Sequence, residues 1–259
     1  MKARLKFLNK NVRVKPQLSY RNLFLIFVLF AAGFAVYAFN LNNPLFWDDT
    51  DWIVNNPFVH SFSLESVKNW FTKNTLAGIG LKSNYYRPFL FFTFASNYVL
   101  HGSNPIGFHL VNNLLHIANG ILIFLLLSNV FKNKFIPFFV SLLFLLHPLQ
   151  TEAVTYVAGR GDPLNVFFML LALLLFYKAE QKNLSWKNPA RFATLPLLIL
   201  ALLSRETAII FPFLLMVFYI AFIAEGMFWA SLKKSFIKAL PYFGIVFIYG
   251  ILRLTALNF

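Results

Sequence analysis

Seven long apolar segments constrain the fold of this 259-residue chain more than any other feature. A bilayer core about 30 Å thick needs about 20 mostly apolar helical residues per crossing, so the segments predict membrane-spanning helices. Their ranges are 22–39, 106–131, 135–149, 164–179, 192–203, 207–224 and 240–257. Only 12% of the residues are charged, whereas a soluble domain carries about 25%. The sequence therefore predicts an all-α, polytopic transmembrane helical bundle.

The basic residues indicate how the spans are oriented. If residues 1–21 are cytoplasmic, the cytoplasmic segments hold 16 of the 23 Lys and Arg, and seven of the nine acidic residues lie on the other side. Lys and Arg concentrate in cytoplasmic loops, so the N-terminus is predicted to be cytoplasmic. The net charge of +14 is then a signal of topology, and no nucleic-acid partner is expected. The richness in Lys, Asn and Phe points to an AT-rich genome, which favours a bacterial cytoplasmic membrane over the endoplasmic reticulum.

Residues 1–21 form a basic cytoplasmic segment, and residues 22–259 form the transmembrane domain. That domain includes a non-cytoplasmic loop at 40–105, far longer than a connection needs. Within it, Ser63 can cap an amphipathic helix over 63–72, fit to lie in the membrane interface. The apolar run 88–100 is too short to span and is expected to lie along the interface, buried against the bundle.

The first of four polar groups near the outer ends of the spans is an acidic cluster between two tryptophans. Asp48, Asp49 and Asp51 stand within four positions, so their mutual repulsion should raise a pKa or recruit a cation. The cluster is either a solvated acidic turn or a functional site. A functional site could supply a general base, and it would also permit a divalent cation, although no metal ligand set is assigned.

The second group is a polar stripe in the segment 106–131. Spacings of three and four residues place its members on one helix face: His109, Asn112, Asn113, His116 and Asn119. Such a stripe can mark a site, but in a packed bundle it more often makes hydrogen bonds between helices. No metal site is predicted here, because the two histidines lie two turns apart without a third ligand.

The third and fourth groups follow later spans. One contains His147, Glu152, Arg160 and Asp162, and the other contains Arg205 and Glu206. Their arginines either form ion pairs with neighbouring carboxylates or bind a phosphate, which the planar guanidinium suits.

Together the groups suit one reaction type. A lipid-phosphate-linked sugar arrives within the bilayer, a carboxylate can take the proton of an attacking hydroxyl, and a guanidinium can stabilise the leaving phosphate. Asp49, with Asp48 as the alternative, is the candidate base, and Arg160 and Arg205 are the candidate phosphate ligands.

The order of motifs resembles a known family. WDDTDWIVNNP, YYRPFLFFTFASNYVLHGSNPIGFHLVNNLLH, LLHPLQTEAVTYVAGRGDPL and LLSRETAIIFPFLL are similar to the membrane region of TMTC-type O-mannosyltransferases and of bacterial relatives that carry tetratricopeptide repeats. The resemblance implies a GT-C fold and a polyprenyl- or dolichyl-phosphate sugar donor, often mannose. By position it assigns Asp48 and Asp49 to the catalytic acidic motif. It matches Glu152, Arg160 and Asp162 to the next outer loop of the family, and Arg205 and Glu206 to the loop after that. Four more residues are candidate supporting residues of the site: Asp51, Arg87, His109 and His147.

These observations predict a membrane glycosyltransferase that acts on a hydroxyl of a protein or glycan acceptor. Enzymes of this type usually have about eleven or more spans followed by repeats, so the chain is expected to be the N-terminal portion of one. Two alternatives remain open. One is a non-catalytic fragment or partner subunit that needs a second polypeptide, and the other is a transporter of lipid-linked sugars. All three imply contact with membrane lipid.

Overall fold

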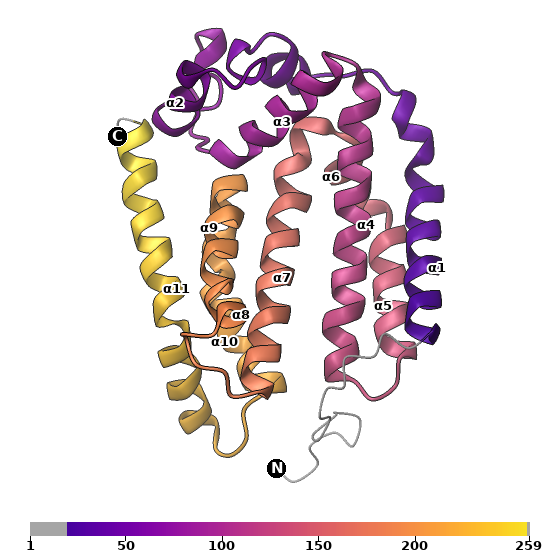
Figure 1. Cartoon of the computed structure of the whole chain (residues 1–259), viewed down its shortest axis with the longest axis vertical. Coiled ribbons are helices and arrows are strands. Elements are labelled where there is room, and N and C mark those ends of the chain that lie inside the picture. Colours follow the sequence, from indigo (N-terminus) through magenta and orange to yellow (C-terminus); the bar gives the residue numbers. More distant parts are fainter. Residues whose placement is uncertain (1–19, 258–259) are drawn as a thin grey trace.

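The structure is a computed structural model that describes residues 20–257, so the basic segment predicted at 1–21 lies almost entirely outside it. Figure 1 shows a bundle of long helices and, at one end, a layer of short helices and turns. Residues 20–257 contain no β-strand. The prediction of an all-α bundle is confirmed.

Two groups of helices make up the bundle. One consists of α1 (Tyr20–Tyr37), α4 (Pro105–Val130) and α5 (Phe135–Leu146). The other consists of α7 (Gly161–Gln181), the short α8 (Pro189–Phe192), α9 (Thr194–Ser204), α10 (Phe211–Phe222) and α11 (Phe228–Leu257). Contacts between α4 and α7 join the two groups. Apolar side chains of α4, α7, α9, α10 and α11 form the largest buried cluster.

The number of spans is less simple than the sequence predicted. Within residues 20–257, four helical segments are long and apolar enough to cross a membrane by themselves: Tyr20–Asn42, Pro105–Val130, Val157–Gln181 and Phe228–Leu257. A fifth crossing would combine α5 with Pro148–Thr155, which are bent by 54°. The break lies at His147, whose extended backbone precedes Pro148, as expected for a residue before proline. The predicted spans at 192–203 and 207–224 are shorter helices, separated at Arg205 by an extended residue.

The layer at the end of the bundle, here called the outer layer, contains α2 (Leu64–Thr72), α3 (Pro88–His101) and α6 (Thr151–Thr155) (Figure 1). Short turns connect them: η1 (Ala38–Asn42), η2 (Thr50–Val54), η3 (Pro57–Val59), η4 (Ala77–Ile79), η5 (Pro148–Gln150) and η6 (Val157–Arg160); η7 (Glu206–Ile210) precedes α10.

The outer layer has its own buried core. Ser63 caps α2, accepting a hydrogen bond from the Ser66 amide at 3.1 Å, as predicted. Trp70 of α2 does not face lipid, however, because it is buried in this core and its Nε1 donates to the Phe58 carbonyl at 2.6 Å. Phe94 of α3 is buried in the same core, so α3 packs inward as predicted.

The polar stripe of α4 joins α4 to other bundle helices and, through a bond from Asn112 to the Val154 carbonyl of α6 at 3.2 Å, to the outer layer. Its side chains bond mostly to backbone carbonyls of other elements. Asn113 donates to the Tyr37 carbonyl at 3.0 Å, and Asn119 donates to the Pro163 carbonyl at 2.8 Å. His116 contacts the Leu145 carbonyl at 3.2 Å. The stripe therefore forms hydrogen bonds between elements, which is the structural alternative weighed for it.

Candidate active site

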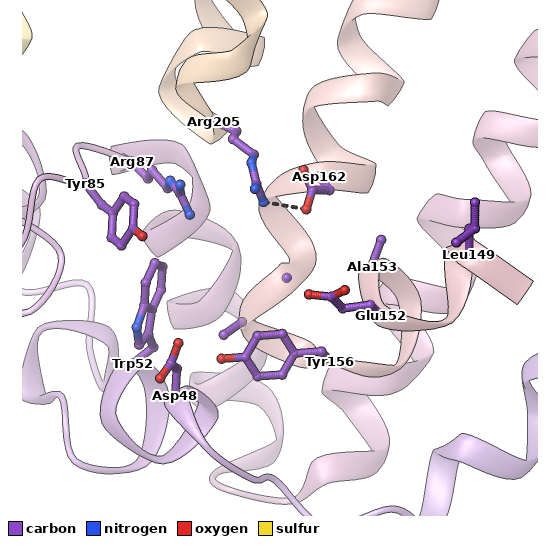
Figure 2. A pocket seen from close by; sticks show the side chains of 12 residues that line it. Asp48, Trp52, Tyr85, Arg87, Leu149, Glu152, Ala153, Tyr156, Asp162 and Arg205 are labelled. Atoms are coloured by element: carbon purple, nitrogen blue, oxygen red, sulfur yellow. Dashed lines mark hydrogen bonds and ion pairs between the residues drawn. The ribbon is translucent and has the colours of Figure 1, made fainter.

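A pocket of about 450 Å³ opens where the outer layer meets the ends of α7 and α9 (Figure 2). The loop after α1 and the segment that precedes α3 form one part of its lining. The rest comes from α6, from η6, from the first turn of α7 and from the residue that follows α9. The lining residues are Asp48, Trp52, Tyr85, Arg87, Leu149, Glu152, Ala153, Tyr156, Ala158, Gly159, Asp162 and Arg205. Three of the four polar groups that the sequence singled out therefore meet in one cavity.

Three carboxylates line this pocket: those of Asp48, Glu152 and Asp162. Figure 2 shows the Tyr156 side chain reaching toward Asp48 from the wall that carries Glu152. Burial is the main cause that raises the pKa of the Tyr156 hydroxyl, and the neighbouring Asp48 carboxylate raises this pKa further. The phenol therefore stays protonated near neutral pH and can donate a hydrogen bond to Asp48.

Asp49 points away from the pocket and into the protein. Its side chain is 0% exposed, and Oδ1 accepts a hydrogen bond from the Ala158 amide at 2.6 Å. Oδ2 accepts from the Phe46 amide at 3.3 Å. Burial raises the pKa of Asp49 to about 6, and Asp48 adds to the rise, although these backbone donors oppose it. Asp49 is thus placed to hold the Asp48 turn against the pocket wall at Ala158, and it does not line the pocket.

The pocket's two arginines are both paired. Arg205 forms an ion pair with Asp162, drawn as a dashed line in Figure 2, and its side chain is partly exposed. Arg87 donates to both oxygens of Glu206, at 3.0 and 2.9 Å, and its guanidinium lies 4.3 Å from the centre of the Tyr85 ring. Arg205 is therefore the cation more available to an anionic ligand, and Arg87 is held between Glu206 and an aromatic wall.

Arg160 requires a correction. The sequence placed it among the phosphate ligands, but its side chain is 0% exposed and lies outside the pocket. Its guanidinium donates to Asn112 and Asn97 at 2.7 Å each, to the Phe108 carbonyl at 3.0 Å and to Thr93. These partners use all three nitrogens to tie α3 to α4. In this position Arg160 joins α3 to α4 and does not line the pocket.

Besides Glu206, three further predicted residues lie away from the pocket lining. Asp51 accepts a hydrogen bond from Asn55 at 3.3 Å at the surface. His109 is buried and contacts the Asn43 carbonyl at 3.1 Å. His147 caps η5, with Nδ1 accepting from the Leu149 amide at 3.2 Å. Each of them shapes a turn next to the site.

Seven of the twelve lining residues were not predicted as site residues from the sequence, and two of the seven are tyrosines. Tyr85 and Tyr156 both fall within the motifs that carry the family resemblance, and their place in those motifs was the available signal. Nothing in the hydropathy or spacing of either residue indicated a pocket, because the pocket forms only when three distant segments meet.

The three clustered aspartates do not converge on a point. Asp48 lines the pocket, whereas Asp49 and Asp51 bond elsewhere. Within residues 20–257, no group of three or more His, Asp or Glu side chains is arranged to hold a metal ion. This geometry does not fit the divalent cation that the acidic cluster permitted.

Comparison with known proteins gives the family context. The chain is 30% identical over 218 residues to a Caenorhabditis elegans protein O-mannosyl-transferase, covering 82% of this chain and 29% of that protein. It is 34% identical over 196 residues to human protein O-mannosyl-transferase TMTC1, covering 70% of the chain and 22% of the relative. The Drosophila melanogaster Tmtc1 is 32% identical over 181 residues, covering 69% and 21%.

The chain is homologous to the TMTC-type protein O-mannosyl-transferases. No family model matches it, and no solved structure matches it. The chain spans less than a third of the length of these TMTC-type relatives. The resemblance stated from the motifs is confirmed at the level of sequence similarity.

Proposed function

We propose that the pocket is the transfer site of a membrane glycosyltransferase, which moves a sugar from a polyprenyl- or dolichyl-phosphate donor to a Ser or Thr hydroxyl of a protein. The sugar is proposed to be mannose, because the relatives are named as protein O-mannosyl-transferases. The observation that carries the proposal is the meeting of Asp48 and Arg205 in one pocket at the end of an apolar bundle.

The proposed chemistry assigns a role to each of these two side chains. The acceptor hydroxyl attacks the anomeric carbon and gives its proton to the Asp48 carboxylate. The bond between that carbon and the phosphate oxygen breaks, and the lipid phosphate leaves with the electron pair. Arg205 stabilises the charge that develops on the phosphate. Asp162 orients Arg205, and Glu152 can bind a sugar hydroxyl.

The pocket is proposed to face the non-cytoplasmic side. Every segment predicted to be outward lies at its end of the bundle in Figure 1, while the turns between α4 and α5, α7 and α8, and α10 and α11 lie at the other end. A lipid-linked donor would reach the pocket from the bilayer, because the pocket lies at the end of the apolar helices.

The distribution of polar side chains in the structure fits a transporter less well than a transferase. A transport pathway would need polar side chains across the whole bundle. The polar stripe of α4 ends at Asn119, and farther along the helix Leu122, Phe124 and Leu126 are buried among apolar neighbours. Transfer within an outward pocket fits this distribution better.

The experiment is transfer of labelled mannose from polyprenyl-phosphate mannose to a Ser/Thr-rich acceptor protein by the purified chain. Asp48→Asn should reduce turnover by about 100-fold or more, the usual contribution of a general base. Glu65→Gln, which neutralises an exposed carboxylate on α2, is the matched control and should transfer normally. Asp49→Asn should lose less than Asp48→Asn, because an amide oxygen still accepts from Ala158.

Unchanged turnover in Asp48→Asn would overturn the assignment of the base. If the chain transfers only when a second membrane polypeptide is added, the partner-subunit alternative is correct. If the chain neither binds the donor nor transfers sugar under either condition, the proposed function is wrong.

A further inference from the structure

Trp47 combines two features that each cost free energy. Its backbone has φ = 51°, in the left-handed region that bulky residues rarely adopt. Its side chain is 80% exposed, although large aromatic rings gain from burial. Strained residues persist where the surrounding structure holds them in place, and they cluster at ligand-binding positions. The proposed transfer chemistry gives Trp47 no role.

The surrounding turn fixes Trp47 at the edge of the pocket. Its carbonyl accepts from the Thr50 amide at 3.1 Å, and the Asp49 amide donates to the Phe46 carbonyl at 3.1 Å. The Trp47 ring meets the Tyr156 ring edge-on, with centroids 6.3 Å apart, and the Phe46 ring at 5.3 Å. Tyr156 lines the pocket, as does Asp48, the next residue along the chain.

We propose that Trp47 and Tyr156 form an aromatic subsite for the sugar ring of the lipid-linked donor; this inference rests on the proposed function. One face of a pyranose ring consists of C–H groups, which pack against an aromatic ring, while its hydroxyls need polar partners. Asp48 and Glu152 supply such partners in the same pocket. A lipid phosphate without a sugar has no such face, so the subsite distinguishes the loaded donor from the spent carrier.

An exposed tryptophan can also anchor a protein in the membrane interface. The contact between Trp47 and a ring that lines the pocket favours the sugar, because an anchor needs no such neighbour. The two roles predict different ligand dependence, and that difference is the basis of the test.

The test measures binding of polyprenyl-phosphate mannose and of polyprenyl phosphate to the full chain in lipid nanodiscs. Trp47→Gly should weaken binding of the mannose lipid by roughly three- to tenfold, the worth of one aromatic contact, and leave the bare phosphate unchanged. Trp47→Phe should recover part of the loss. Trp229→Phe is the matched control, since Trp229 is 76% exposed at the start of α11, at the opposite end of the bundle.

A stability measurement separates this effect from misfolding. Glycine accepts a positive φ and alanine does not, so Trp47→Gly should unfold at a higher temperature than Trp47→Ala. An equal loss for both lipids, or no loss for either, would overturn the sugar subsite. If the wild-type chain binds neither lipid, it is the proposed function that fails.

Discussion

At the scale of the residue, two adjacent carboxylates have different environments. Asp48 lines the pocket, whereas Asp49 is enclosed and accepts hydrogen bonds from the backbone amides of Phe46 and Ala158. The acidic motif therefore contains one side chain able to meet a substrate and one that fixes the turn. The difference comes from the backbone of the 46–50 turn, where Trp47 takes its unusual conformation.

The buried Asp49 should make stability depend on pH. Folding raises the pKa of Asp49 from 3.8 to about 6, so the folded chain holds a proton that the unfolded chain has released. Stability should therefore fall as pH rises from about 4 to about 6, by up to ~3 kcal/mol. Asp49→Asn has no carboxylate to ionise and should lose this dependence. Thermal unfolding of both proteins at pH 4 and pH 7 tests this, and parallel shifts would contradict it.

The two arginines assigned to phosphate by sequence should respond differently to substitution. Arg160→Lys leaves buried acceptors on Asn97 and Asn112 without donors, since an ammonium cannot reproduce the guanidinium fork. We expect a loss of about 3 kcal/mol or more in unfolding free energy. Arg205→Lys should unfold like the wild type, because Arg205 is partly exposed, but should lose transfer. Unfolding curves and transfer rates of the two variants test this expectation. If Arg160→Lys lost transfer without loss of stability, and Arg205→Lys lost stability, the roles assigned to the two arginines would be exchanged.

At the scale of the element, close contacts of glycine hold α1, α4 and α5 together. A Cβ placed on Gly120 of α4 would lie 2.6 Å from the Leu145 side chain of α5. A Cβ on Gly33 of α1 would lie 2.9 Å from Ile117 of α4. Small residues let helices approach closely within a membrane, where apolar burial gives little drive.

Adding one methyl group to α4 should therefore separate two helices. Gly120→Ala is expected to destabilise the protein by about 1–3 kcal/mol, the usual cost of overpacking. Gly244→Ala in α11 is the matched control, because no atom lies within 4 Å of its added Cβ, and it should unfold no earlier than the wild type. The measurement is thermal unfolding in one detergent, and equal transitions for the two variants would refute the close contact.

At the scale of the whole molecule, the end of the bundle that carries the pocket is also the end that the distribution of Lys and Arg predicts to lie outside the cytoplasm. The polar segments that form the pocket are far apart in the chain, yet all lie in the outer layer or directly beneath it (Figure 1). For the proposed transfer reaction, the sidedness of the pocket decides which compartment supplies the acceptor.

The chain has no cysteine, so single-cysteine variants can report this sidedness. Lys68→Cys on α2 should react with a membrane-impermeant maleimide in intact cells. Lys187→Cys, in the turn between α7 and α8, should react only after the membrane is permeabilised. Both positions are exposed, so access to the reagent decides the result. Labelling of Lys187→Cys alone in intact cells would reverse the orientation and place the pocket in the cytoplasm.

The sequence by itself determined the apolar helical segments and predicted their sidedness, because apolar runs and the positions of Lys and Arg are local properties of the chain. It also identified the outer polar segments that meet at the pocket. Only the tertiary structure decided that Asp48 lines the pocket while Asp49 is buried, and that Arg205 is available while Arg160 is enclosed. The positions of the two aspartates depend on the direction of the 46–50 turn, and the enclosure of Arg160 depends on the packing of α3 against α4. Both arrangements bring together residues more than 40 positions apart in the chain.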